Sequence, residues 1–217
     1  LHVLKTRVEN FAPPMLEQLS QQRTIFEYWS HAAAFLPTAD YRYYLPVMHG
    51  FARHRDINKK LQGQVLARIA AEGPLQAKDF SDPRAGKASG WWDWKPSKQV
   101  LESLFLGGEL MIARRQGFQK VYDLTERVLG SDVDTRLPSA RERGEFYVRR
   151  MLAAHGLATA RDIAYPRASV LHLSRDNIQP LITTALRDMV DAGELCQLDV
   201  AGDTYFALAA ALAALPS

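Results

Sequence analysis

The sequence predicts a mainly α-helical fold with small β-ribbons, arranged as two winged helix-turn-helix modules in tandem. The first observation is an internal repeat. Residues 73–80 align with residues 156–163, and both show glycine, then alanine, a basic residue, aspartate and an apolar residue. A second match lies downstream, where residues 106–110 and 191–195 each contain a Gly-Glu-Leu run. An amphipathic helix precedes each copy and a predicted hairpin follows each, which is the order of elements in a winged helix.

Residues 1–54 are expected to form a partial N-terminal module of helices and one strand. Its first helix is entered through Pro13 and Pro14, since proline is tolerated in a first helical turn. The β-branched and aromatic residues of 24–29 predict a short strand. Thr38 is expected to cap a further helix.

The first winged helix is predicted over residues 55–129. Its opening helix, residues 56–72, has apolar residues at helical spacing, and we expect Asp56 to cap it and a Gly-Pro pair to end it. A ribbon is predicted over residues 110–124, with its turn near Gln116-Gly117. The apolar stripe of the helix consists of Ile57, Leu61, Val65, Leu66 and Ile69.

A polar linker over residues 130–139 leads to the second winged helix, residues 140–209, and residues 210–217 form a tail. This module is predicted to contain two long helices, the second beginning at a serine cap, and a ribbon that turns at a Gly-Asp pair. These elements are residues 140–155, residues 174–192 with Ser174 as the cap, and residues 195–208 with the turn at Gly202-Asp203.

Composition and charge narrow the classes of function. The 217 residues include 27 Lys and Arg against 24 Asp and Glu, and a formal net charge of +3 permits nucleic-acid binding without demanding it. Cys196 is the single cysteine, which excludes an intrachain disulfide framework and a cysteine zinc site. Apolar stretches fall short of the ~20 residues of a membrane span. We expect a cytoplasmic, nucleoid-associated protein with no metal, no cofactor and no membrane partner.

Positive charge gathers where a winged helix meets DNA. Basic residues and tryptophans interleave over residues 82–98, and further basic residues flank the tip of the first ribbon, which suits contact with phosphates and stacking on bases. Two alternatives stay open: the tryptophans fill a hydrophobic gap between domains, and the ribbon charges only keep the hairpin soluble. The second ribbon is acidic at Asp199 and Asp203, and we expect it not to touch DNA. The predicted DNA-binding residues are Arg84, Lys87, Trp92, Lys95, Lys98, Arg114, Arg115 and Lys120.

One short segment carries side chains that could act in catalysis, because residues 27–31 hold a carboxylate, a phenol and an imidazole beside a tryptophan. In a strand, Glu27, Trp29 and His31 share one face. Glu27 or His31 could act as a general base or position a water, and Trp29 could stack on an extruded base. The alternative is a core strand with a hydrogen-bonded histidine and a buried tryptophan.

Three runs together resemble one family, the bacterial winged-helix DNA glycosylases that unhook interstrand crosslinks and remove alkylated bases. They are residues 27–31, the Ser-Gly-Trp-Trp-Asp-Trp-Lys-Pro run at 89–96, and the run at 117–128 that begins Gly-Phe-Gln-Lys-Val-Tyr-Asp-Leu. The resemblance implies a monofunctional DNA repair enzyme whose partner is double-stranded, alkylated or crosslinked DNA. It also implies tandem winged helices followed by a β-barrel.

The same resemblance implies how the chemistry proceeds. An alkylated purine is cationic and leaves readily, so the enzyme has only to stabilise the oxocarbenium charge on the sugar and position a water, without a metal. The family's catalytic signature, glutamine, an apolar residue, then glutamine or aspartate, has no match here, and we expect it upstream of Leu1, with the barrel after Ser217. Many members place glutamate after the histidine of the Trp-Ser-His run, and this chain has Ala32. Glu27 and His31 are therefore expected to line the edge of the pocket.

Two other functions remain open at this stage. One is a non-enzymatic DNA-binding protein such as a transcriptional regulator, and the other is a winged-helix scaffold that binds only protein. The low net charge and the acidic second ribbon favour the scaffold slightly. If the family resemblance is right, this portion alone binds DNA weakly and excises nothing.

Overall fold

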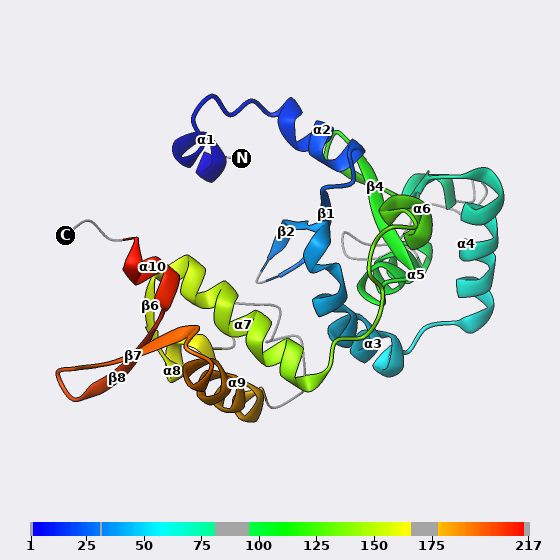
Figure 1. Ribbon diagram of the computed structural model, residues 1–217. Helices are drawn as coiled ribbons and strands as arrows, with labels where there is room; N and C mark the ends of the chain where they lie inside the picture. The colour runs from blue at the N-terminus through cyan, green and yellow to red at the C-terminus, as the bar shows by residue number, and fades with distance from the viewer. Residues whose placement is uncertain (1, 31, 81–95, 166–177, 215–217) are drawn as a thin grey trace. The chain divides into compact units, whose positions relative to one another are not determined.

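The described residues of the computed structural model divide into two compact units, Leu1–Thr135 and Arg136–Ser217. The division falls inside the predicted linker over residues 130–139. Helices dominate both units, and the strands form only small antiparallel sheets. The prediction of a mainly α fold with small β-ribbons is confirmed. The structure describes residues 2–30, 32–80, 96–165 and 178–214 (Figure 1).

The first unit holds two antiparallel sheets among short helices. Its helical segments are α1 (His2–Arg7), α2 (Pro14–Gln21), η1 (Thr38–Tyr44), α3 (Leu45–His54), α4 (Lys59–Glu72), η2 (Ala77–Phe80), α5 (Pro96–Leu106) and α6 (Thr125–Leu129). Its strands are β1 (Ile25–Trp29), β2 (Ala33–Pro37), β3 (Leu75–Gln76), β4 (Leu110–Gln116) and β5 (Gln119–Leu124). The helix entered through proline is α2, with Pro14 in its first turn, as predicted.

The strand predicted over residues 24–29 is confirmed as β1, which pairs antiparallel with β2. Phe26 of β1 is buried and packs edge-on against Tyr41 and Tyr44, with ring centroids 5.4 and 5.9 Å apart. Edge-to-face contact is a favoured geometry for aromatic pairs. This aromatic cluster anchors the β1–β2 hairpin to η1.

The prediction that Thr38 caps a helix is wrong. The main-chain N–H of Thr38 donates to the carbonyl oxygen of Thr24 at 2.9 Å and so closes the end of the β1–β2 hairpin. The chain then coils as the 3-10 segment η1, without a side-chain cap, and α3 begins only at Leu45.

The helix predicted over residues 56–72 forms as α4, but it begins at Lys59. Asn58 caps it, because its Oδ1 accepts from the main-chain N–H of Leu61 at 3.1 Å. The prediction that Asp56 caps this helix is therefore wrong. Val65 and Ile69 of the predicted stripe are fully buried, and the helix ends at Gly73, whose φ of +88° favours glycine.

The ribbon predicted over residues 110–124 is confirmed as the β4–β5 hairpin. Arg115 lies opposite Lys120 and Gln116 opposite Gln119, so the turn consists of Gly117 and Phe118. The short strand β3 pairs with β5, which makes a three-stranded sheet in the order β3-β5-β4. The β1–β2 hairpin packs against this sheet, since β1 contacts β4.

The second unit is built on two long helices and one three-stranded sheet. The helix predicted over residues 140–155 is confirmed as α7. It begins at a capping box in which Ser139 and Glu142 each bond the main chain of the other. Its elements are α7 (Ala140–His155), β6 (Leu157–Thr159), α8 (Ala160–Ile163), α9 (Gln179–Asp191), β7 (Leu195–Val200), β8 (Asp203–Leu208) and α10 (Ala209–Ala213).

Two details of the second unit differ from the predictions. Helix α9 begins at Gln179, with Pro180 in its first turn, so the helix does not run back to residue 174; Ser174 itself lies outside the described residues. Val200 pairs with Asp203, so the hairpin turns at Ala201 and Gly202. Both turn residues have positive φ, +54° and +90°, as a two-residue hairpin turn that matches the strand twist requires.

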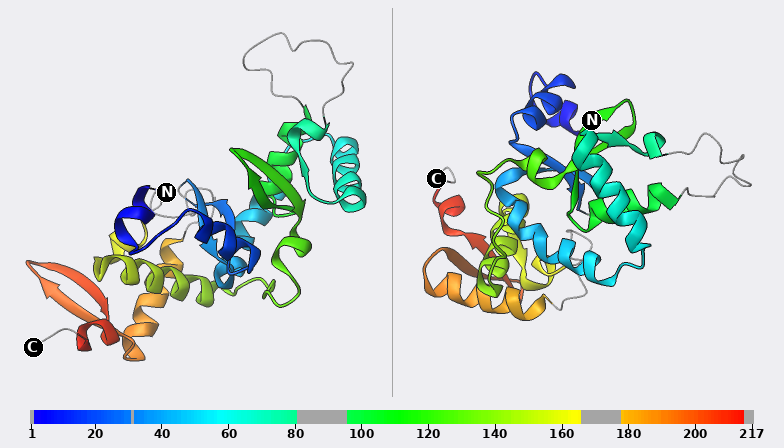
Figure 2. Two further views of the ribbon diagram at one scale, coloured as in Figure 1. Left: turned by 90° about the horizontal axis from the view of Figure 1, so that it is seen from above. Right: turned by 90° about the vertical axis from the view of Figure 1, so that its right-hand side faces the viewer.

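The two units repeat one order of elements: long helix, short strand, short helical turn, second long helix, hairpin and a closing short helix. The sheets match as well, since β3-β5-β4 and β6-β8-β7 both place the last strand in the centre. Figure 2 shows the β4–β5 and β7–β8 hairpins from two further sides. Within the described ranges, no helix combines the length and the hydropathy of a membrane span.

Candidate nucleic-acid interface

The described site residues all belong to the first unit. Glu27 lies on β1, Lys98 in the first turn of α5, Arg114 and Arg115 on β4, and Lys120 on β5. The other predicted residues, His31, Arg84, Lys87, Trp92 and Lys95, lie outside the described residues.

Arg115 and Glu27 form a two-point ion pair between β4 and β1. Arg115 Nε donates to Glu27 Oε2 at 2.9 Å, and Nη2 donates to Oε1. Glu27 is only 6% exposed, whereas the Arg115 side chain is 36% exposed. The hydrogen bond to Glu27 raises the pKa of the Arg115 guanidinium above its ordinary value, so this side chain stays charged. In this arrangement both Glu27 oxygens accept hydrogen bonds from arginine.

Arg115 also fixes the tip of the hairpin. Its Nη1 donates to the main-chain oxygen of Phe118 at 3.0 Å. One guanidinium thus connects the buried carboxylate of β1 with the turn that follows β4. The interaction holds the turn in place from within the first unit.

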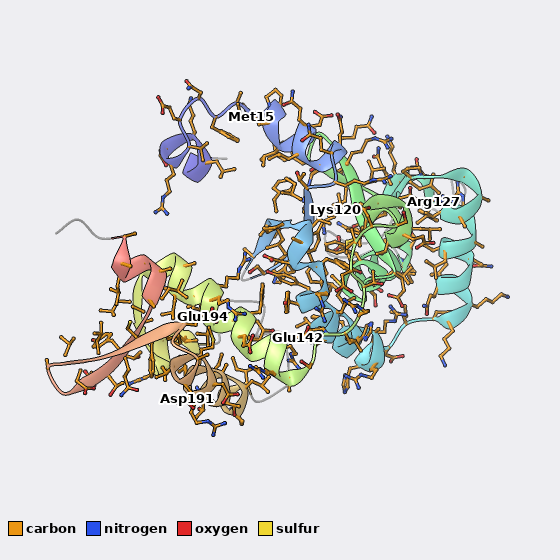
Figure 3. All side chains as sticks on the ribbon, in the orientation of Figure 1. Met15, Lys120, Arg127, Glu142, Asp191 and Glu194 are labelled. Atoms are coloured by element: carbon orange, nitrogen blue, oxygen red, sulfur yellow. The ribbon has the colours of Figure 1, made fainter. Side chains whose placement is uncertain are left out.

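Lys120, which is labelled in Figure 3, also has a carboxylate partner in the first unit. Its Nζ lies 3.0 and 2.9 Å from the two carboxylate oxygens of Glu102 on α5, and Tyr122 Oη donates to Glu102 Oε1 at 2.8 Å. The Lys120 ammonium also sits 4.6 Å from the ring centroid of Phe105, a cation–π contact. Burial, followed by the charge of Glu102, raises the pKa of Tyr122, which keeps the phenol protonated as a donor. This network ties the hairpin to α5.

Arg114 differs from its neighbour on β4. Its side chain is exposed and forms neither a hydrogen bond nor an ion pair with any other described residue. Lys98 is also exposed, in the first turn of α5 beside the exposed Gln99. Arg114 and Lys98 thus place positive charge at the surface of the β4–β5 hairpin and of α5.

The tip of the first hairpin carries Phe118, which is not among the site residues predicted from the sequence. Phe118 is 95% exposed, next to Gly117, whose φ is +59°. The available signal was its place in the turn, since an apolar residue directly after a turn glycine has no strand partner to pack against. Sequence inspection placed Phe118 only within a family run.

The corresponding hairpin of the second unit has a different surface. Asp199 and Asp203 are exposed, and Thr204 Oγ1 donates to Asp199 Oδ1 at 3.0 Å. The two turn residues are small, Ala201 and Gly202. At the tips of these two hairpins, positive charge and an aromatic side chain are thus found in the first and not in the second.

The β1 segment departs from the alternative of a fully buried strand. Trp29 is 37% exposed, which does not fit the alternative of a buried tryptophan, while Tyr28 is fully buried. Tyr28 Oη donates to the carbonyl oxygen of Leu106 at 2.7 Å, which attaches β1 to the end of α5. Among the residues that the structure describes, no three His, Cys, Asp or Glu side chains gather as metal ligands would.

The comparison with known families decides the identity. The family model described as DNA glycosylase AlkZ-like matches residues 1–217. The chain belongs to the AlkZ-like DNA glycosylase family. The resemblance to DNA glycosylases seen in the sequence is thereby confirmed.

A solved member of the AlkZ-like group provides the structural comparison. DNA glycosylase AlkZ of Streptomyces sahachiroi matches with a TM-score of 0.60 and 21% sequence identity, over 94% of this chain. At this identity the match shows a shared fold. The chain spans 58% of the length of the AlkZ chain.

Proposed function

We propose that this chain takes part in DNA repair as the DNA-binding portion of a monofunctional glycosylase that removes alkylated bases and unhooks interstrand crosslinks. The observation that carries the proposal is the AlkZ-like family match along residues 1–217. The proposed partner is double-stranded DNA, and the proposed place of action is the bacterial nucleoid in the cytoplasm. A purely regulatory or protein-binding role is not favoured by this family match.

In this proposal the two repeats act as winged helix-turn-helix modules with limits at residues 55–129 and 140–209. The repeated order of elements and the shared strand order support this assignment. A winged helix presents its third helix to the major groove and its hairpin to the flanking backbone. Helix α5 and the β4–β5 hairpin are the corresponding surfaces of the first module.

The basic residues of the first module then divide into two groups. Arg114 is exposed and contacts phosphates, which attract cations without regard to sequence, and Lys98 on α5 is a further proposed contact. Arg115 and Lys120 have carboxylate partners within the fold, so they hold the hairpin against β1 and α5. Arg84, Lys87, Trp92 and Lys95 remain proposed contacts from the segment before α5.

Glu27 takes a positioning role in the proposal. Glu27 is only 6% exposed and both its oxygens already accept hydrogen bonds from the Arg115 guanidinium, which favours a role in holding Arg115 over one in orienting a water. Glu27 therefore contributes to the proposed pocket edge by holding Arg115 in place. His31 is the second residue proposed to line this edge. Loss of a cationic alkylated base needs stabilisation of positive charge on the sugar and one positioned water.

Two assays on this chain test the proposal. Duplexes with and without one N7-methylguanine are titrated with the protein, and binding is followed by fluorescence anisotropy at several salt concentrations. The same alkylated duplex is incubated with the protein and heated with alkali, which cuts the strand at abasic sites. We expect salt-dependent binding to both duplexes and no strand cleavage.

The results separate the parts of the proposal. Failure to bind duplex DNA at low salt contradicts it. Cleavage would show that the catalytic group lies within residues 1–217 and would overturn the positioning role, leaving Glu27 with His31 as the first residues to replace.

A further inference from the structure

We propose that Phe118 is an apolar wedge that enters a base step of bound duplex DNA from the minor groove. This inference rests on the proposed function, because it names a contact that the first hairpin makes with DNA. Phe118 is 95% exposed, and the next most exposed large apolar side chain among the described residues, Leu137, is 55% exposed. A phenylalanine this exposed presents apolar surface that folding does not bury and that a binding partner can cover.

The fold does not require an aromatic residue at this position. The β7–β8 hairpin has the same place in the second unit, and it turns through Ala201 and Gly202. Both turns join antiparallel strands through two residues, and the strand order and the closing helix are the same in the two units. The phenyl ring therefore adds nothing to the hairpin that alanine or glycine does not provide.

The hairpin presents the ring on a firm support. Arg115 donates to the main-chain oxygen of Phe118 and is itself held by the buried carboxylate of Glu27. Lys120, on the other strand beside the tip, is held by Glu102. A side chain on a braced turn loses little conformational freedom on binding, which favours insertion between bases.

The charges around the ring select a polyanionic partner. Arg114 is exposed on β4, the strand that leads into the turn, whereas the corresponding hairpin of the second unit has Asp199 and Asp203 beside its turn. Proteins that enter the minor groove combine such cations with apolar wedges, and they partly unstack a base step and kink the duplex. Unstacking and kinking are also the first steps toward exposing a base for excision. A protein interface would need a wider apolar patch than one ring.

The test uses duplexes that contain one 2-aminopurine, whose fluorescence rises when its neighbours unstack. The whole chain is compared with Phe118→Ala, with Phe118→Leu, which keeps an apolar wedge, and with Val200→Ala, which trims an exposed apolar residue beside the second turn. Anisotropy gives the Kd and its salt dependence for each protein. Because Phe118 is fully exposed, circular dichroism should be the same for all of them.

We expect the original chain to raise the 2-aminopurine signal several-fold at one or two positions and Phe118→Leu to retain most of this rise. Phe118→Ala should lose it and bind about tenfold more weakly, with an unchanged salt slope, because the phosphate contacts remain. Val200→Ala should behave as the original chain does. An unchanged signal with Phe118→Ala, or binding without any rise in the original chain, overturns the wedge and leaves the proposed function standing. Absence of duplex binding overturns both.

Discussion

Arg115 of the first hairpin and Glu27 of the N-terminal strand form a bidentate pair, with Nε donating to Oε2 at 2.9 Å and Nη2 donating to Oε1. Sequence reasoning assigned these residues to separate tasks, one to DNA contact and the other to a pocket edge. Their pairing joins the two tasks, since the position of the hairpin depends on the strand that carries Glu27.

Replacing Glu27 with glutamine should loosen the hairpin and lower stability. The substitution leaves the Arg115 guanidinium without its carboxylate, and we expect the free energy of unfolding to fall by about 1–2 kcal/mol, moderated by the exposure of Arg115. Urea denaturation measures the change. A double-mutant cycle with Arg115→Gln should give a coupling energy of about 1 kcal/mol. A coupling energy near zero would show that the pair adds nothing to the fold.

Gly144 should be intolerant of any side chain because α7 crosses α9 there. A Cβ at this position would lie 2.6 Å from the main-chain oxygen of Leu181, too close for a neighbour that cannot move aside. We expect Gly144→Ala to destabilise the second unit by about 1–3 kcal/mol.

Gly63 provides the matched control for Gly144. It lies in the middle of α4, and a Cβ there would meet nothing within 4 Å. Gly63→Ala should therefore stabilise the protein by about 0.5–1 kcal/mol, because alanine favours helix. Thermal melts followed by circular dichroism compare the two. Equal effects of the same sign would contradict the proposed crossing.

Acid should weaken the second unit through Glu194. Hydrogen bonds from Arg149 lower the pKa of Glu194 below its ordinary 4.5, so the pair stabilises the fold above that pH and this stabilisation is lost as the pH falls through the lowered value. Glu194→Gln should thus have a lower Tm than the original chain at about pH 7, and the gap should close toward about pH 3. A difference in Tm between the two proteins that persists at acidic pH would show that it comes from packing and not from the charge of Glu194.

The sequence predicted the elements with strong local signals and missed those set by tertiary contacts. The β4–β5 hairpin and α7 were predicted from local signals, a turn glycine after a Gly-Glu-Leu run in the first case and an amphipathic pattern in the second. Thr38 was misassigned because its main chain bonds Thr24 across a hairpin, and that pairing cannot be read from spacing.

The candidate site shows the same limit. The basic residues near the first turn were predicted as one DNA-binding set. The sequence did not show which of them have carboxylate partners within the fold. Glu27 is 88 residues from Arg115 along the chain, and only the packing of β1 against β4 brings them together. The internal partner of Lys120, by contrast, lies on the neighbouring helix α5, within the same predicted module.

The salt dependence of duplex binding by the chain and two single variants shows whether the first hairpin contacts DNA. Arg114→Ala removes an exposed cation from the first hairpin, and Arg161→Ala removes an exposed cation from α8 of the second unit, so both change the net charge equally. If Arg114 contacts a phosphate, its loss should weaken binding and reduce the slope of log K against log salt by about 0.9, while Arg161→Ala leaves the slope unchanged. Equal slopes for both variants, or binding that does not respond to salt, would contradict DNA binding through the first hairpin.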